Sequence, residues 1–224
     1  MSALLRFFSS SVGTKVLIAL TGLGFAAFLV THLAANLMVL VDVHAYNEYS
    51  HKLVSNPLIY IAEAGLVLLF VTHAFKAIAN YARNRGARPE GYSLKRRAGH
   101  TSRKTLASTT MIVTGTWLLV FIVIHLKLFK FGTWYDTPDG TMRDLARLVN
   151  EDFQKPLYVV FYVLSMAVVG LHLRHGLSSA FQSLGIDHPK YTPLILKAGL
   201  IVAIAMSLGF AAIPLVIFLT GGRS

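Results

Sequence analysis

The sequence predicts an all-α membrane protein with five transmembrane helices. Three observations support this: 54% of the 224 residues are hydrophobic, only 14% are charged, and the apolar residues gather in five long stretches. These stretches cover residues 13–41, 57–82, 105–131, 156–182 and 193–219. Each exceeds the roughly 20 residues that an α-helix needs to cross about 30 Å of hydrocarbon. Almost no chain remains for a soluble domain, so we expect one membrane domain over residues 1–224.

The first stretch, residues 13–41, is too long for a removable signal peptide and lacks the small-residue cleavage site of one. We therefore expect it to remain as the first membrane span. The chain contains no cysteine. Disulfides, thiolate-held iron–sulfur clusters and covalently attached c-type haem are therefore excluded.

Charge predicts the orientation of the helices. Segment 83–104 carries eight basic residues against the single acid Glu90, whereas segment 132–155 is rich in acids. Basic segments remain on the cytoplasmic side. We therefore expect the N-terminus inside, and segments 42–56 and 132–155 and the C-terminus outside. Orientation and anionic lipid account for the net charge of +11 without a nucleic-acid partner, and segment 83–104 also suits the docking of a cytoplasmic partner.

The second and fourth stretches carry histidines at matching depths. Proline suits the first turn of a helix, so we expect these helices to begin at Pro57 and Pro156. His73 and His172 each follow their proline by 16 residues. At 1.5 Å per residue, both lie about 24 Å below the outer surface, close to the cytoplasmic side.

The first and third stretches place their histidines at the other side. His32 follows Lys15 by 17 residues, and His125 follows Lys104 by 21 residues, along helices that run outward. We call His32 and His125 the outer pair and His73 and His172 the inner pair. The two layers are roughly 20 Å apart by the same helical rise. This arrangement fits two b-type haems stacked across the membrane, each iron held by one histidine from each of two helices, with the first four helices as the bundle around them.

An internal repeat supports this arrangement. TGLGFAAFLVTHL (21–33) aligns without gaps with TGTWLLVFIVIHL (114–126). Each threonine precedes its histidine by 11 residues, so it lies on the same helix face, about 16 Å nearer the inner pair. The adjacent Gly22 and Gly115 would let a flat macrocycle approach the backbone. The alternative is that these small residues only allow close helix packing.

Segment HLRHG (172–176) offers a second histidine, His175. His172 matches His73 in depth, whereas His175 lies about 4.5 Å nearer the cytoplasm. We therefore assign His172 as the ligand. His175 and Arg174 are better placed to reach the interface or to meet haem propionates.

At this point the sequence resembles the dihaem cytochrome b membrane anchor of succinate dehydrogenase and fumarate reductase, the five-helix single-subunit type. The resemblance runs over most of the chain. It rests on KVLIALTG (15–22), THLAANL (31–37), YNEYSHKLVSNPLIYIAE (46–63), THAFKAIANYARNR (72–85), FIVIHL (121–126) and HLRHG (172–176).

The resemblance implies an electron-transfer subunit of respiratory complex II in a bacterial cytoplasmic membrane. His32 with His125 would hold the outer haem b, and His73 with His172 the inner one. A flavoprotein subunit and an iron–sulfur subunit on the cytoplasmic side would interconvert succinate and fumarate. The outer haem would exchange electrons with menaquinone or another quinone, and this chain alone would not act on succinate.

The candidate quinone site lies toward the outer side. Glu63 is the only acid within a predicted helix core, about 9 Å below the outer surface. An acid at membrane depth is a candidate proton carrier. Glu48, His44 and Asn36 are expected at the same level. The alternatives are a hydrogen bond from Glu63 to a neighbouring helix and an ordinary solvated loop histidine at His44.

Two other classes of protein remain open. The cytochrome b anchor of a hydrogenase or formate dehydrogenase would also use paired histidines, and a transporter could use them as proton relays. The same rather than inverted topology of the repeat argues against the transporter. One departure from part of the family is Gly170, where some fumarate reductase anchors carry a glutamate proposed as a transmembrane proton path.

Overall fold

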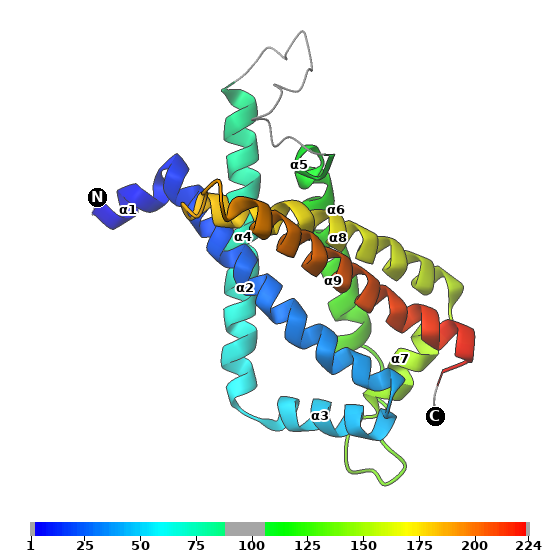
Figure 1. The fold of residues 1–224 in the computed structure, drawn as a ribbon. Coiled ribbons are helices and arrows are strands. Elements are labelled where there is room, and N and C mark those ends of the chain that lie inside the picture. Colours follow the sequence, from blue (N-terminus) through cyan, green and yellow to red (C-terminus); the bar gives the residue numbers. More distant parts are fainter. Residues whose placement is uncertain (1–2, 88–105, 223–224) are drawn as a thin grey trace.

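The computed structural model describes residues 3–87 and 106–222 (Figure 1). Five of the helices are long and apolar enough to cross a membrane: Ser11–Leu40, Leu58–Gly86, Met111–Lys130, Pro156–Ser183 and Thr192–Thr220. Within the described residues the only β-structure is an isolated bridge between Asp136 and Arg143. The expectation of an all-helical protein with five candidate membrane spans is confirmed.

The described residues form the following helices in chain order: α1 (Ala3–Ser9), α2 (Ser11–Leu37), α3 (Val43–Ser55), α4 (Leu58–Gly86), α5 (Leu106–Thr109), α6 (Met111–His125), α7 (Leu145–Phe153), α8 (Pro156–Ser183) and α9 (Thr192–Thr220). A 3₁₀ turn, η1 (Met38–Leu40), extends α2, and a π-helical turn, η3 (Leu126–Lys130), extends α6. The third span begins at Met111, later than the expected residue 105, because α5 is a separate turn. The Thr110 hydroxyl bonds to the Ala107 carbonyl at 3.4 Å there, a local bond of the kind that competes with helix continuity.

Local signals set the helix starts. Ser10 caps α2 by accepting a hydrogen bond from the Gly13 amide at 3.0 Å. Asn56 accepts one from the Leu58 amide at 2.9 Å, directly before α4. Pro156 is the first residue of α8, and Pro57 immediately precedes α4. The two prolines used to measure histidine depth therefore stand at the helix starts, as expected.

Helix α8 lies at the centre of the packing. It contacts α9 most extensively and also contacts α2 and α6. Buried Ser165 accepts a hydrogen bond from the Trp117 ring at 3.0 Å, and Ser207 on α9 donates to the Met166 carbonyl at 2.8 Å. By contrast, α4 has no buried residue and lies at the edge of the bundle. The fifth span, α9, therefore packs more closely into the bundle than α4 does, which differs from the expectation that the first four helices alone form the bundle.

Helices α3 and α7 pack together across one end of the bundle, which we call the α3 end (Figure 1). Buried Asn47 joins them: its amide donates to Asp144 Oδ1, and its carbonyl oxygen accepts from the Ala146 amide, both at 2.8 Å. Segments 42–56 and 132–155, expected only as loops, thus carry helices and lie at the same end. The C-terminal end of α9 also contacts α7 there, whereas α1 lies at the opposite end.

The basic segment 83–104 is described only through residue 87, so most of it lies outside the described residues. Its first residue belongs to the last turns of α4, where the Arg83 guanidinium donates to the Thr14 hydroxyl at 3.0 Å. This contact fastens the end of α4 to the start of α2, opposite the α3 end.

Candidate functional site

The inner pair joins two helices that are far apart in the sequence. His73 projects from α4 and His172 from α8. Their ring centroids are 6.4 Å apart, and the ring planes are inclined by 64°. The structure thus brings together the two histidines that the depth count placed in one layer.

A threonine of a neighbouring helix contacts each inner histidine. Thr21 Oγ1 on α2 lies 3.1 Å from His73 Nδ1, and Thr114 Oγ1 on α6 lies 3.1 Å from His172 Nδ1. Both threonines are buried, at 6% exposure each. The threonines of the repeat therefore reach the inner layer, as their spacing predicted.

The glycines that follow these threonines make room for the histidine rings. A Cβ atom on Gly22 would lie 3.2 Å from His73 Cε1, and one on Gly115 would lie 3.6 Å from His172 Cε1. The first of these contacts is tighter than ordinary van der Waals distance. The group that lies close to each of these glycines is therefore the imidazole ring of an inner histidine. The sequence alone did not predict this contact.

The outer pair lies toward the α3 end. The His32 ring on α2 and the His125 ring at the end of α6 have centroids 5.9 Å apart, with planes inclined by 86°. Phe28 stacks on His32 at 5.1 Å, and Phe121 stacks on His125 at 5.7 Å. These two phenylalanines occupy equivalent positions in the repeat, four residues before each histidine.

Different polar groups reach the outer histidines. His32 Nδ1 lies 3.3 Å from the Asn36 amide nitrogen, which also donates to the His32 carbonyl at 2.8 Å. The Asn36 oxygen in turn accepts from the buried Tyr46 hydroxyl at 3.3 Å. On the other helix, His125 Nδ1 lies 3.3 Å from the Tyr162 hydroxyl. Asn36, a candidate quinone residue, thus links His32 to α3.

Both pairs suit a metal held between two axial imidazoles. A metal–imidazole bond is about 2 Å long, so two coaxial rings on one metal have centroids roughly 6 Å apart. The observed separations are 5.9 and 6.4 Å. In the described ranges 3–87 and 106–222, no three His, Cys, Asp or Glu side chains gather as a metal site. A macrocycle that supplies its own in-plane nitrogens fits this donor set, and haem is such a group.

Arg143 supplies a cationic group near the outer pair. Its terminal nitrogen donates to the carbonyls of Gly132 and Thr133 at 3.4 and 3.2 Å. Its Nε is buried and has no hydrogen-bond partner among the described residues. The guanidinium interacts electrostatically with Tyr46, the residue that reaches His32 through Asn36. A buried, unpaired donor suits the anionic propionate of a haem, and sequence reasoning did not find it because the signal is a side-chain contact.

The other residues of α8 that the sequence singled out, His175, Arg174 and Gly170, do not share the contacts of His172. The His175 ring has no ring contact or hydrogen bond within the described part of the chain, and Arg174 is exposed. At Gly170 a Cβ atom would lie 3.0 Å from Ser207 Cβ. A larger side chain at position 170 would therefore push α9 away from α8, which gives a packing reason for glycine there.

The candidate quinone residues Glu63, Glu48 and Asn36 each have a different partner in the structure. Glu63 forms an ion pair with Lys130 of η3, and Glu48 pairs with Lys52 at 2.6 Å. Lys52 and nearby His44 hold the pKa of the Glu48 carboxyl below its ordinary value, mainly through the Lys52 hydrogen bond. Within the described ranges, no hydrogen bond or ion pair joins Glu63, Glu48 and Asn36 to one another. The Lys130 partner of Glu63 is new relative to the sequence reasoning.

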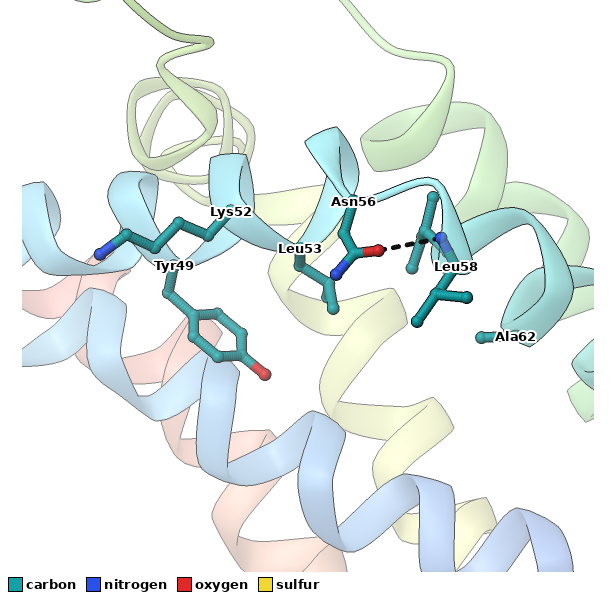
Figure 2. A pocket seen from close by; sticks show the side chains of 7 residues that line it. Tyr49, Lys52, Leu53, Asn56, Leu58 and Ala62 are labelled. Carbon is teal, nitrogen blue, oxygen red and sulfur yellow. Dashed lines mark hydrogen bonds between the residues drawn. The ribbon is translucent and has the colours of Figure 1, made fainter.

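A pocket of about 430 Å³ lies where α3 turns into α4. Figure 2 shows Tyr49, Leu53 and Asn56 of the α3 side facing Leu58 and Ala62 of α4. The lining is mostly apolar. The Tyr49 hydroxyl and the Asn56 amide nitrogen have no hydrogen-bond partner within the described residues, so both remain available as donors. Sequence reasoning missed this pocket because the helical nature of segment 42–56 was not recognised.

No family model, no curated protein and no solved structure matches the chain. What the geometry defines is therefore a multi-pass helical membrane protein with two histidine pairs, one toward each end of its bundle.

Proposed function

We propose that this chain is the membrane anchor and electron-transfer subunit of a succinate:quinone oxidoreductase in a bacterial cytoplasmic membrane. It would pass electrons between an iron–sulfur subunit and a membrane quinone through two b haems. The observation that carries the proposal is the pairing of four histidines from four helices, at centroid separations of 5.9 and 6.4 Å. The resemblance of the sequence to dihaem anchors supplies the particular reaction.

In this proposal each residue has a defined role. His32 and His125 would hold the outer haem, and His73 and His172 the inner one. Bound haem supplies one-electron redox chemistry. Arg143 is suited to hold a propionate at the outer haem, and Arg174 and His175 at the inner one. Aromatic rings lie against ligands of both pairs: Phe25 against His73, Phe28 against His32 and Phe121 against His125.

The partners follow from what the chain lacks. With no cysteine it cannot ligate an iron–sulfur cluster, so a separate subunit must carry the clusters, and a flavoprotein subunit the succinate reaction. The eight basic residues of segment 83–104 suit the docking of these subunits beside the inner pair. Lipid surrounds the remaining apolar faces.

We propose that the quinone reaction takes place at the α3 end. A quinone ring is flat and apolar, and its two carbonyl oxygens accept hydrogen bonds. The pocket between α3 and α4 suits this chemistry, because its size lies in the range of small-molecule sites and Tyr49 and Asn56 face it as donors. Two acids are adjacent in the chain to pocket residues: Glu63, paired with Lys130, follows Ala62, and Glu48, paired with Lys52, precedes Tyr49. Of these, Glu63 lies within a membrane span and is our candidate for proton delivery.

The proposal is tested on the protein purified from its native membrane in mild detergent. Pyridine haemochrome should give two haem b per chain, and flavin and iron–sulfur subunits should copurify. Succinate should then reduce the haems. Absence of haem would favour the transporter, whereas haem without a succinate-oxidising partner would favour the anchor of another quinone-linked dehydrogenase.

A further inference from the structure

We propose that Thr21 and Thr114 are positioning residues for the inner haem. Each hydroxyl accepts a hydrogen bond from the Nδ1–H of an inner histidine and thereby fixes the tautomer in which Nε2 carries the free lone pair. This inference rests on the proposed function, because it assigns the partners of the haem ligands. It concerns the inner pair alone.

The hydrogen bonds of Thr21 determine the direction of its contact with His73. Thr21 Oγ1 donates its single proton to the Leu17 carbonyl at 2.6 Å, so it can only accept from His73 Nδ1, 3.1 Å away. The Ile18 carbonyl lies 3.2 Å from the same nitrogen and is also only an acceptor. Two acceptors at Nδ1 require a proton there, which leaves Nε2 unprotonated in the neutral ring.

Thr114 makes the equivalent side-chain contact from α6, where it is the hydrogen-bond partner of His172 Nδ1 within the described residues. Its hydroxyl donates to the Met111 carbonyl at 3.1 Å and accepts from His172 Nδ1 at 3.1 Å. Both threonines are 6% exposed, so water does not compete for these bonds. The equivalence follows from the sequence repeat, which places Thr21 and Thr114 at the same register of α2 and α6.

A hydrogen bond from Nδ1–H makes an imidazole a stronger electron donor through Nε2 and orients its ring toward the metal. A stronger donor stabilises ferric over ferrous iron. The Thr21 and Thr114 hydroxyls should therefore lower the midpoint potential of the inner haem and increase the retention of that haem. A residue that only fills space at these positions would change neither property when its hydroxyl alone is removed.

The experiment compares Thr21→Val and Thr114→Val, which keep the shape of the side chain, with Thr21→Ser and Thr114→Ser, which keep the hydroxyl. Thr31→Val on α2 and Thr116→Val on α6 are matched controls, because these hydroxyls bond only to backbone carbonyls of their own helices. Redox titration of the purified complex, with haems assigned in His73→Ala and His32→Ala, gives each midpoint potential. Haem retention is measured on dilution.

In the valine variants the inner haem should become easier to reduce. A tenfold loss of ferric preference corresponds to about 59 mV for a one-electron couple, and haem affinity should fall by roughly 10- to 100-fold. The serine variants should restore both values, and the controls should match wild type. The inference is overturned if serine behaves like valine, if valine behaves like wild type, or if the outer haem shifts equally. The proposed function fails separately if the wild type carries no haem.

Discussion

At the inner pair, the Nδ1 atom of each histidine lies 3.1 Å from a threonine hydroxyl. At the outer pair, His32 Nδ1 lies 3.3 Å from the Asn36 amide nitrogen, and His125 Nδ1 lies 3.3 Å from the Tyr162 hydroxyl. The two inner histidines thus share the same kind of side-chain partner, with the Ile18 carbonyl as an additional contact of His73, whereas the two outer histidines do not. The stacked phenylalanines show that the outer pair still follows the repeat, since Phe28 and Phe121 occupy equivalent positions.

The difference arises from where the partners lie in the chain. Both inner partners belong to the repeat, so duplication of the segment duplicates the hydrogen bond. At the outer pair, Tyr46 reaches Asn36 from α3, and Tyr162 belongs to α8, and neither residue lies within the repeated segments. The repeat therefore determines the positions of the two outer histidines and of the phenylalanine that stacks on each. Residues outside the repeat determine the hydrogen-bond partners of the outer histidines.

The largest expected effect comes from removing the ligands themselves. Because a six-coordinate haem needs both axial imidazoles, His73→Ala or His172→Ala should remove the inner haem, and His32→Ala or His125→Ala the outer one. His175→Ala should leave both. Pyridine haemochrome with redox titration of each variant measures which haem remains.

One result would break the comparison between the pairs. If His175→Ala loses a haem while His172→Ala retains both, the inner layer lies about one helical turn nearer the cytoplasm than assigned. If any single substitution removes both haems, the two pairs do not bind independently.

Replacement of Glu63 by Gln tests whether the α3 end carries the proton chemistry. The change preserves shape but removes the ionisation and the ion pair with Lys130. Quinone reduction takes up two protons, so succinate–quinone turnover should fall by roughly a hundredfold, the scale of a lost general acid. Haem content and reduction of an artificial acceptor should remain normal. Glu48→Gln tests the other candidate acid in the same assay. Turnover in Glu63→Gln within a few-fold of wild type would leave Glu63 a structural ion-pair residue and make Glu48 the leading candidate.

The span positions could be predicted because long apolar stretches have one stable arrangement in lipid, and because Pro57 and Pro156 mark helix starts. The short helices α3 and α7 were missed, since their mean hydropathy is low. A signal was nevertheless present: Asp42 and Asp144 stand one residue before them and cap them, accepting amide hydrogen bonds at 3.0 Å each.

The histidine depths followed from helical rise alone, but their partners could not. The Thr21–His73 contact joins residues 52 apart, and the Glu63–Lys130 pair joins residues 67 apart. Such contacts depend on how each helix is rotated about its axis. Hydropathy does not determine that rotation when, as in α4, every face is apolar enough for lipid.

A third prediction concerns helices α3 and α7, which cover the α3 end of the bundle beside the outer pair. Asn47→Ala should leave the buried Ala146 amide without its partner and remove one of the hydrogen bonds that Asp144 accepts, at a cost of about 1–3 kcal/mol in the free energy of unfolding. Because α3 and α7 cover only the α3 end, the outer haem should be lost at a lower temperature and the inner haem should be retained as in wild type. Thermal titration followed by haem absorbance measures both.

Asn84→Ala is the matched control, because this exposed asparagine of α4 makes no hydrogen bond within the described residues. Equal loss of both haems in Asn47→Ala would mean that α3 and α7 stabilise the whole bundle and not only its α3 end.

The smallest expected effect is a pH dependence confined to the α3 end. The Lys52 hydrogen bond and charge lower the pKa of Glu48 from its ordinary 4.5, with a further contribution from His44. A carboxylate with a lowered folded-state pKa stabilises the fold above its unfolded-state pKa, and this contribution disappears as the pH falls through the folded-state value. Glu48→Gln should therefore slightly lower the unfolding temperature near neutral pH, and the difference from wild type should vanish as the pH falls through the lowered pKa of Glu48. Because Glu48 and Lys52 are well exposed, at 46% and 72% of their side chains, added salt should reduce the difference at neutral pH as well. If the effect of Glu48→Gln is unchanged by both acid and salt, the glutamate stabilises the fold through the packing of α3 and not through its charge.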